Sequence, residues 1–362
     1  MSVRSESGQW CAATQAGPSR RELLAGGAAA RALAWSSRAA AVPAGTDANY
    51  ADIDPELIDD LRLLAEMEVD ADNLLAFRHR PPARHAHPLP PSSMPAKPDR
   101  RSIPGLAGEP PVTVLVLDLT RERRERPAVV WMHGGGFVAG GAGIPAPLVA
   151  AAAEHGWLIV SVDYRLAPEA HYPAALNDNY AALRWVHDNA AALCVDRSRI
   201  AVGGASAGGG HAAMLALAAR DRREVPVAYQ ILIYPMLDDR TGSTRPAPAG
   251  TGHHVWTARS NRFGWSALLG QPAGTANVPA GVVPGRRSDL AGLPPAFIGA
   301  GTLDLFVAED IAYATALAAA GVKVDLAVVP AAYHAFDGVA PLARVSREFT
   351  ARWIGDLRAA LA

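Results

Sequence analysis

From residue 112 onward, short apolar runs alternate with longer segments of helical pattern. The β-branched-rich runs predict strands over residues 112–117, 128–132, 158–162, 200–202, 230–234, 295–299 and 324–329. Helical patterns between them include residues 174–192, 207–219 and 308–320. This alternation is typical of an α/β fold in which helices cover both faces of a mostly parallel sheet. Residues 239–293 interrupt it with turn-rich sequence and one short helix near 261–269, so we interpret them as an insertion.

The region 46–111 has a different pattern. Asp54, Pro55 and Glu56 predict a helix start, because they suit the N-cap, the first helical position and the first turn. An apolar stripe at helical spacing follows, formed by Leu57, Ile58, Leu61, Leu64 and Ala65. Residues 78–111 are rich in Pro and Arg and predict a connector. Two interpretations stay open: a packed helix followed by a linker, or a lid over a cleft formed downstream.

Residues 1–45 do not fit the α/β pattern, and we leave them out of the fold. Residues 19–24, Ser-Arg-Arg-Glu-Leu-Leu, resemble a twin-arginine export signal, and residues 42–44 would supply a small-residue cleavage site. Arg31 and Arg38, however, interrupt the apolar region that such a signal needs. The alternative is that residues 1–45 are an N-terminal extension. We therefore predict a cytoplasmic location, with export as the alternative.

Length and composition exclude several classes of protein. A chain of 362 residues suggests two domains or one large α/β unit with a lid. The 34 basic and 35 acidic residues leave a net charge of −1, without the positive field that nucleic-acid binding needs. Only Cys11 and Cys194 are present, which excludes a disulfide scaffold and a cysteine-based zinc site. The longest charge-free stretch, residues 200–219, contains five glycines and His211, so we interpret it as a strand, turn and helix instead of a membrane span.

The turn inside that stretch has the pattern G-x-S-x-G. Gly204 and Gly208 flank Ser206 between a predicted strand and a predicted helix, the context in which this motif indicates a nucleophilic serine. A sharp turn of this kind leaves no room for side chains two positions to either side. It also places the hydroxyl at a helix N-terminus, where negative charge is favoured. The alternatives are a Gly-rich turn with a surface serine and a phosphate cradle, and the cradle is disfavoured because no G-K-[ST] follows.

A second glycine cluster follows the strand predicted at 128–132. His133 is followed by three glycines and Phe137, so backbone N–H groups can turn into a cleft without obstruction. Acyl transfer needs such donors where a carbonyl oxygen becomes an oxyanion. We expect the N–H groups of Gly134, Gly135 and Ala207 to form this oxyanion hole.

A serine hydroxyl needs a base, and the base needs an orienting acid. His334 lies in the loop that leaves the strand predicted at 324–329, at the same sheet edge as Ser206. Asp304 follows the strand at 295–299 and lies between serine and histidine in the order typical of this motif. Its rivals, Glu309 and Asp310, begin the next helix, where acids are expected for dipole reasons alone.

Three further segments complete a pattern that we identify with a family. These are residues 163–169 (Asp-Tyr-Arg-Leu-Ala-Pro-Glu), 232–240 (Leu-Ile-Tyr-Pro-Met-Leu-Asp-Asp-Arg) and 301–306 (Gly-Thr-Leu-Asp-Leu-Phe). With the two glycine motifs, they resemble the hormone-sensitive-lipase-like carboxylesterases of the α/β-hydrolase superfamily, from about residue 50 to the C-terminus. By this resemblance Ser206, Asp304 and His334 match the catalytic triad, and Gly134, Gly135 and Ala207 match the oxyanion hole.

The resemblance implies an α/β-hydrolase fold with a helical cap. Residues 50–95 and 240–293 would form the cap over the acyl and alcohol pockets, and residues 112–362 the catalytic domain. It implies hydrolysis of short- to medium-chain acyl esters without a cofactor, and pairing as a homodimer through an edge strand. Because His334 must be neutral to act as a base, activity is expected to fall at acid pH.

Two other functions remain open at this point: an amidase or peptidase on the same fold, and a ligand-binding receptor with an inactive triad. The chain also departs from the family pattern. Ala205 stands where many members carry Asp, and Ala335 follows the histidine where glycine is usual. Finally, Arg165 lies between Asp163 and Glu169, and we interpret these three as an ion-pair cluster that braces the oxyanion loop.

Overall fold

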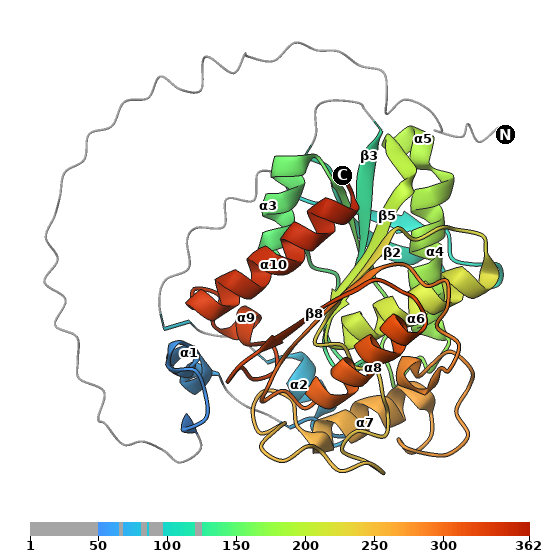
Figure 1. The fold of residues 1–362 in the computed structure, drawn as a ribbon. Coiled ribbons are helices and arrows are strands. Elements are labelled where there is room, and N and C mark those ends of the chain that lie inside the picture. Colours follow the sequence, from blue (N-terminus) through green and yellow to red (C-terminus); the bar gives the residue numbers. More distant parts are fainter. Residues whose placement is uncertain (1–49, 65–67, 81–84, 87–96, 120–124) are drawn as a thin grey trace, which may run out of the picture. The chain divides into compact units, whose positions relative to one another are not determined.

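The computed structural model describes residues 50–64, 68–80, 85–86, 97–119 and 125–362 (Figure 1). The predictions for residues 1–45 and for Ala65 lie outside these ranges. Residues Ile53–Ala362 form one compact unit, to which the following description is confined.

An eight-stranded sheet forms the centre of this unit. Its order is β1-β2-β4-β3-β5-β6-β7-β8. The two pairs that include β2 are antiparallel, and every pair from β4 to β8 is parallel. The strands are β1 Asp99–Ile103, β2 Val112–Leu117, β3 Arg126–Met132, β4 Leu158–Asp163, β5 Val195–Ala205, β6 Tyr229–Ile233, β7 Ala296–Gly301 and β8 Val324–Val329.

Helices lie on both faces of the sheet (Figure 1). Helices α3 and α10 pack together on one face, and α4 packs on α6 on the other. The helices are η2 Pro55–Leu57, α1 Ile58–Leu63, α2 Leu74–Arg78, α3 Ala146–His155, α4 Ala174–Asp188, α5 Ala190–Leu193, α6 Ala207–Arg222, α7 Ala258–Leu269, η3 Pro284–Arg286, α8 Val307–Ala319, α9 Phe336–Val339 and α10 Arg344–Ala360.

All seven predicted strands are present, which confirms the α/β class with a mostly parallel sheet. The connector predicted at 78–111 is wrong over Asp99–Ile103, which forms the edge strand β1. This strand is polar and mostly exposed, so it lacks the apolar alternation by which a half-buried strand is recognised. The helix predicted at 174–192 is divided at Asn189 into α4 and α5.

The helix start predicted at Asp54 is confirmed. The Asp54 side chain accepts a hydrogen bond from the Glu56 N–H, and Pro55 occupies the first helical position. The helix begins as the 3-10 turn η2 and continues as α1 to Leu63.

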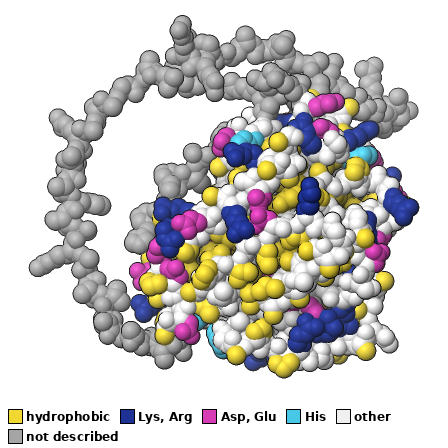
Figure 2. Space-filling view, viewed as in Figure 1, with side chains coloured by type: hydrophobic (Ala, Val, Ile, Leu, Met, Phe, Trp, Pro, Cys, Tyr) yellow, Lys and Arg dark blue, Asp and Glu magenta, His cyan; other side chains and the backbone are white. Residues whose placement is uncertain are grey.

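The central strands carry the core. Every residue of β3, β6 and β7 is buried, as expected for parallel strands covered on both faces. The one charged residue among them, Arg126, pairs with Asp118 at 2.6 Å. On the face shown in Figure 2, acidic and basic side chains are interspersed, and hydrophobic side chains gather between them.

Candidate active site

Ser206 lies in the turn between β5 and α6, with φ of 59° and ψ of −122°. Its N–H donates to the carbonyl of Ile233 on the neighbouring strand at 2.8 Å, which holds the turn on the sheet. A Cβ at Gly204 would collide with the backbone of Gly208, and a Cβ at Gly208 would collide with the carbonyl of Met132. The two glycines are therefore needed because α6 begins directly against β3.

The hydroxyl of Ser206, the imidazole of His334 and the carboxylate of Asp304 form one hydrogen-bonded chain. The Ser206 Oγ lies 2.9 Å from His334 Nε2, and His334 Nδ1 lies 2.8 Å from Asp304 Oδ2. All three side chains are buried: Ser206 is 8% exposed, His334 4% and Asp304 0%. The three loops follow β5, β7 and β8, whose carboxyl ends share one edge of the sheet.

Two aromatic rings hold the His334 ring in place. Tyr234 and Phe306 approach it edge-on, with ring centroids 4.9 Å and 5.2 Å away. The Tyr234 hydroxyl donates to Asp337 at 2.8 Å, and burial raises the pKa of that carboxyl. The other Asp304 oxygen, Oδ1, accepts from the Phe306 N–H at 2.9 Å. Tyr234 was not singled out from the sequence, although it lies within the 232–240 motif.

The glycine loop after β3 lies directly against the serine turn. A Cβ on Gly134 would stand 2.9 Å from the Ala205 carbonyl oxygen and 3.5 Å from the Ser206 Cβ. Gly135, Gly136 and Phe137 all have positive φ, of 130°, 62° and 69°, so the chain turns sharply here. Within the described ranges, no oxygen accepts a hydrogen bond from the N–H groups of Gly134 or Gly135.

Aromatic side chains brace this loop from behind. His133 Nδ1 lies 2.8 Å from the Gly134 carbonyl oxygen, and the Tyr164 hydroxyl donates to the His133 carbonyl at 2.6 Å. The His133 and Tyr164 rings stack with centroids 4.2 Å apart, and His211 meets Tyr164 edge-on. Burial lowers the pKa of His133 and lowers that of His211 to about 3, so neutral imidazoles back the loop. In the sequence, only the position of His133 next to the three glycines indicated that it packs against this loop.

The predicted insertion also packs on the glycine loop. A Cβ on Gly136 would overlap the ring of Trp256, and a Cβ on Gly264 of α7 would overlap the Gly136 carbonyl. Trp256 in turn packs near Phe77 of α2, with ring centroids 6.5 Å apart. Both predicted cap segments therefore meet over the loop that follows β3.

Arg78 of α2 provides a polar link between these parts. Its Nε donates to the Val138 carbonyl at 2.7 Å, and its NH2 nitrogen donates to the Ala167 carbonyl at 2.9 Å. Both terminal nitrogens reach Glu169 at 2.7 Å, and this hydrogen-bonded pairing lowers the pKa of Glu169 to about 2. The sequence offered no signal for Arg78, because its partners lie 60 or more residues away.

The ion-pair cluster predicted within 163–169 is wrong in its pairing. Arg165 binds Asp178 of α4 and Glu109, each at 2.8 Å. Asp163 instead accepts from the Ala142 N–H at 3.1 Å, and Glu169 pairs with Arg78. Neighbours in sequence point in different directions along this loop, so local spacing could not identify the partners.

The two rival acids do not contact His334. Glu309 accepts from the N–H groups of Leu237 and Asp238 at 2.7 Å and 3.2 Å, and burial raises its pKa to about 8. Asp310 is also fully buried, and burial raises its pKa well above the usual value. The prediction that they are helix-dipole acids is therefore incomplete, since Glu309 fastens α8 to the segment after β6.

The described ranges lack both a metal-binding cluster and a membrane-spanning helix. They contain no group of three or more His, Cys, Asp or Glu side chains arranged to hold a metal ion. In the same ranges, every helix is too short or too polar to cross a bilayer.

Comparison with known proteins gives consistent matches. Residues 129–338 match the model of a family described as having the alpha/beta hydrolase fold. The carboxylesterase NlhH of Mycobacterium tuberculosis is 39% identical over 246 residues, which are 66% of this chain and 75% of NlhH. Esterase LipI of the same organism is 36% identical over 241 residues, with the same two coverages.

Solved structures agree with these matches. A bacterial heroin esterase superposes with a TM-score of 0.75 at 34% identity, over 86% of this chain and 99% of that one. Esterase LipW from Mycobacterium marinum superposes with a TM-score of 0.71 at 32% identity, over 85% and 96% of the two chains.

Proposed function

This chain belongs to the α/β-hydrolase fold family, among its hormone-sensitive-lipase-like carboxylesterases, and from that premise we propose that Ser206, His334 and Asp304 are its catalytic triad. The protein is a carboxylic ester hydrolase. The hydrogen-bonded chain from Ser206 Oγ through His334 to Asp304 is the observation that supports the assignment of residues.

In the first half of the reaction, Ser206 Oγ attacks the ester carbonyl carbon while His334 Nε2 takes the hydroxyl proton. The carbonyl oxygen becomes an oxyanion, which the N–H groups of Gly134, Gly135 and Ala207 would stabilise. Asp304 accepts a hydrogen bond from His334 Nδ1–H and, remaining ionised, stabilises the imidazolium that forms. His334 then gives its proton to the leaving alcohol, and an acyl-serine remains.

In the second half, a water molecule attacks the acyl carbon and His334 takes its proton. The second tetrahedral intermediate collapses, the proton returns to Ser206 Oγ, and the carboxylic acid leaves. Ala207 suits its role because it begins α6, where the first N–H groups have no partner within the helix.

We propose short- to medium-chain acyl esters as substrates, with the cap segments setting the chain length. Trp256, which packs on Gly136 of the glycine loop, and Phe77 beside it are the cap side chains that support this proposal. The relatives support esters over amides, since those cited above carry carboxylesterase or esterase names. An intact Ser-His-Asp arrangement speaks against an inactive receptor.

The experiment that tests the triad compares Ser206→Ala with Ser198→Ala, an exposed serine of β5. Loss of the nucleophile should lower kcat for a short aryl ester by roughly 10⁴-fold or more. Ser198→Ala should keep the original rate, and an alkyl fluorophosphonate should label the original chain but not Ser206→Ala. Hydrolysis by Ser206→Ala at the original rate would overturn the assignment, and matched ester and anilide substrates would separate an esterase from an amidase.

Homodimer formation remains a proposal from the family resemblance. Within the described ranges β8 pairs only with β7, so its other edge is open to a second copy. Analytical ultracentrifugation tests this proposal.

We also propose a cytoplasmic location. The intact mass of any secreted protein tests this against export.

A further inference from the structure

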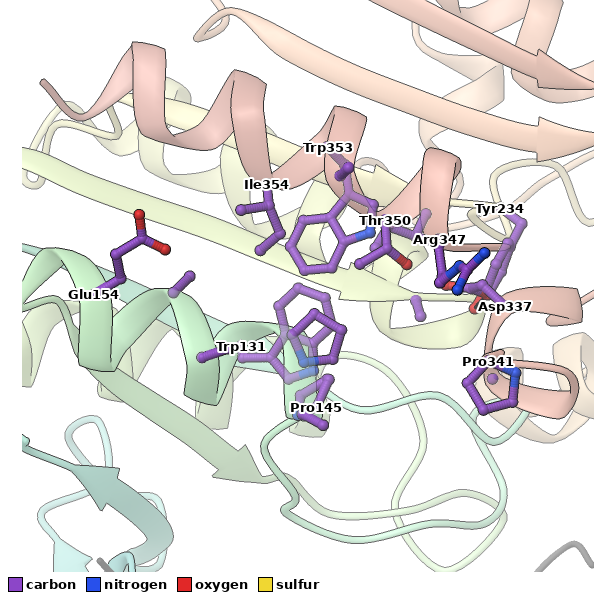
Figure 3. A pocket seen from close by; sticks show the side chains of 18 residues that line it. Trp131, Pro145, Glu154, Tyr234, Asp337, Pro341, Arg347, Thr350, Trp353 and Ile354 are labelled. Carbon is purple, nitrogen blue, oxygen red and sulfur yellow. Dashed lines mark hydrogen bonds between the residues drawn. The ribbon is translucent and has the colours of Figure 1, made fainter. Parts of the chain in front are cut away.

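A groove with a volume of about 630 Å³ opens between α3 and α10 (Figure 3). We refer to it as the α3–α10 groove. Small residues create the space: Ala150 and Ala151 of α3 face Ala351 of α10 across it. Binding sites for small molecules have volumes of this order. It is separate from the catalytic chain, since neither Ser206 nor His334 lines it.

The inner end of the groove nevertheless lies close behind the catalytic site. Ala205, which precedes the nucleophile, contributes to the lining, as do Tyr234 and Asp337. Tyr234 contacts the His334 ring on its other side. The α3–α10 groove and the catalytic imidazole therefore share one residue as a wall.

The middle of the groove is apolar and aromatic. Trp131 of β3 and Trp353 of α10 stack there, with ring centroids 6.2 Å apart and planes inclined by 24°. Ile354 lies beside them (Figure 3). Such a surface favours an alkyl chain, since transfer of each methylene from water contributes about 0.8 kcal/mol.

Two of the polar groups that line the groove are donors. The Trp353 indole N–H is buried and has no hydrogen-bond partner, although Trp353 lines the groove. An indole can only donate, and a buried donor without an acceptor is unfavourable. Arg347 lines the groove six residues earlier on α10. Its side chain is exposed, and within the described ranges its guanidinium has no ion-pair partner.

The groove has two acidic groups, Glu154 and Asp337, and Asp337 lies toward the same end as Arg347 (Figure 3). Glu154 lies at the opposite end from Arg347 (Figure 3), with His155 3.9 Å away. Asp337 already accepts the Tyr234 hydroxyl. An exposed guanidinium with no ion-pair partner in the described ranges and a buried indole donor without an acceptor lie beside an apolar surface. This combination suits a ligand that has a carboxylate and an apolar tail.

We propose that the α3–α10 groove is a second binding site, for an aliphatic monocarboxylate. Its carboxylate pairs with the guanidinium of Arg347 and reaches toward the indole N–H of Trp353. Its alkyl chain lies along Trp131 and Ile354. The site does not depend on the catalytic roles proposed above, because binding requires no turnover.

The test is calorimetric titration of the full chain with decanoate, after the active serine has been blocked with an alkyl fluorophosphonate. If the serine resists labelling, the Ser206→Ala chain is titrated instead, so a failure of the proposed triad does not prevent the measurement. Two variants address the groove: Arg347→Met removes the charge, and Ala351→Phe fills the space. Arg358→Met, an exposed arginine on the same helix, is the matched control. Unchanged thermal unfolding and acetate-ester hydrolysis of the unblocked variants establish that each is folded.

Saturable binding of decanoate is expected, weakened about two- to fivefold by Arg347→Met, as expected for loss of an ion pair to an exposed arginine. Ala351→Phe should abolish it, Arg358→Met should retain it, and neutral decanamide should bind about two- to fivefold more weakly than decanoate. Absence of saturable binding, or equal affinity of the original chain and both groove variants, would overturn the proposal.

Discussion

The loops that hold the catalytic chain and the segments that cover them are fixed in different ways. The turn at Ser206 is positioned by backbone, because Gly204 and Gly208 lack the space for even one added carbon. The α7 backbone at Gly264 touches the Gly136 carbonyl, but otherwise the predicted cap segments, residues 50–80 as far as described and 240–293, reach the glycine loop through side chains. Arg78 and Trp256 are the principal examples.

This difference separates two properties of the enzyme. Backbone-built geometry tolerates little change, so the chemistry is shared across a family. Side-chain contacts can be exchanged while the fold remains, so substrate preference can vary.

The largest effect is expected from Asp304→Asn, within the backbone-positioned part. The amide cannot stabilise the imidazolium of His334 and favours the wrong tautomer, so kcat should fall by about 10³–10⁴-fold. Asp310→Asn is the matched control, since Asp310 is equally buried but makes no hydrogen bond to His334. Steady-state kinetics on one aryl ester measures both, and equal losses would contradict the assignment of the acid.

A smaller effect, on stability, is expected from Gly208→Ala. The added methyl collides with the Met132 carbonyl, and such overpacking costs about 1–3 kcal/mol or more of unfolding free energy. Gly355→Ala on α10 has open space and should gain up to about 1 kcal/mol. Thermal unfolding compares them, and an unchanged Tm in Gly208→Ala would show that the turn is less constrained than described.

Arg78→Met tests the side-chain link from α2 to the glycine loop. Loss of its bonds to the Val138 and Ala167 carbonyls should lower kcat/KM by about 3–10-fold, as expected for one or two part-buried hydrogen bonds. Glu169→Gln keeps an acceptor for Arg78 at an exposed position, so its effect should be under about twofold. A Tm drop without any kinetic change in Arg78→Met would show that α2 only stabilises the fold.

The last prediction concerns the effect of pH on stability through Glu309. Its pKa is about 8 in the folded chain, above the usual value of about 4.3 in the unfolded chain. As pH rises from 5 to 8, only the unfolded chain loses this proton freely, so Glu309 progressively lowers folding stability. Glu309→Gln should therefore gain in Tm relative to the original chain as pH rises over this window. A constant difference in Tm from pH 5 to pH 8 would contradict this.

The sequence predicted that Ser206, Asp304 and His334 lie together, and the hydrogen-bonded chain confirms this proximity. Ser206, Asp304 and His334 each come after a recognisable apolar run, and the carboxyl ends of parallel strands meet at one edge. Gly204 and Gly208 also identified the serine turn, because the close packing of this turn requires glycine at both positions.

The remaining contacts could not be predicted, because they depend on packing between distant segments. Arg165 pairs with Asp178 and Glu109 and not with its sequence neighbours. Arg78 binds residues that lie 60 to 91 positions away in the sequence. The polar edge strand β1 carried no apolar periodicity by which to recognise it. Local pattern specifies where a loop begins, but not which way each of its side chains turns.

The contact between Gly136 and Trp256 has a consequence for how such enzymes diversify. Any residue larger than glycine at 136 would overlap the indole, so a single substitution there is blocked while Trp256 remains. The two positions must therefore change together, or the tryptophan first. Laboratory evolution that varies 136 and 256 as a pair would reach variants that stepwise mutagenesis starting at 136 never samples.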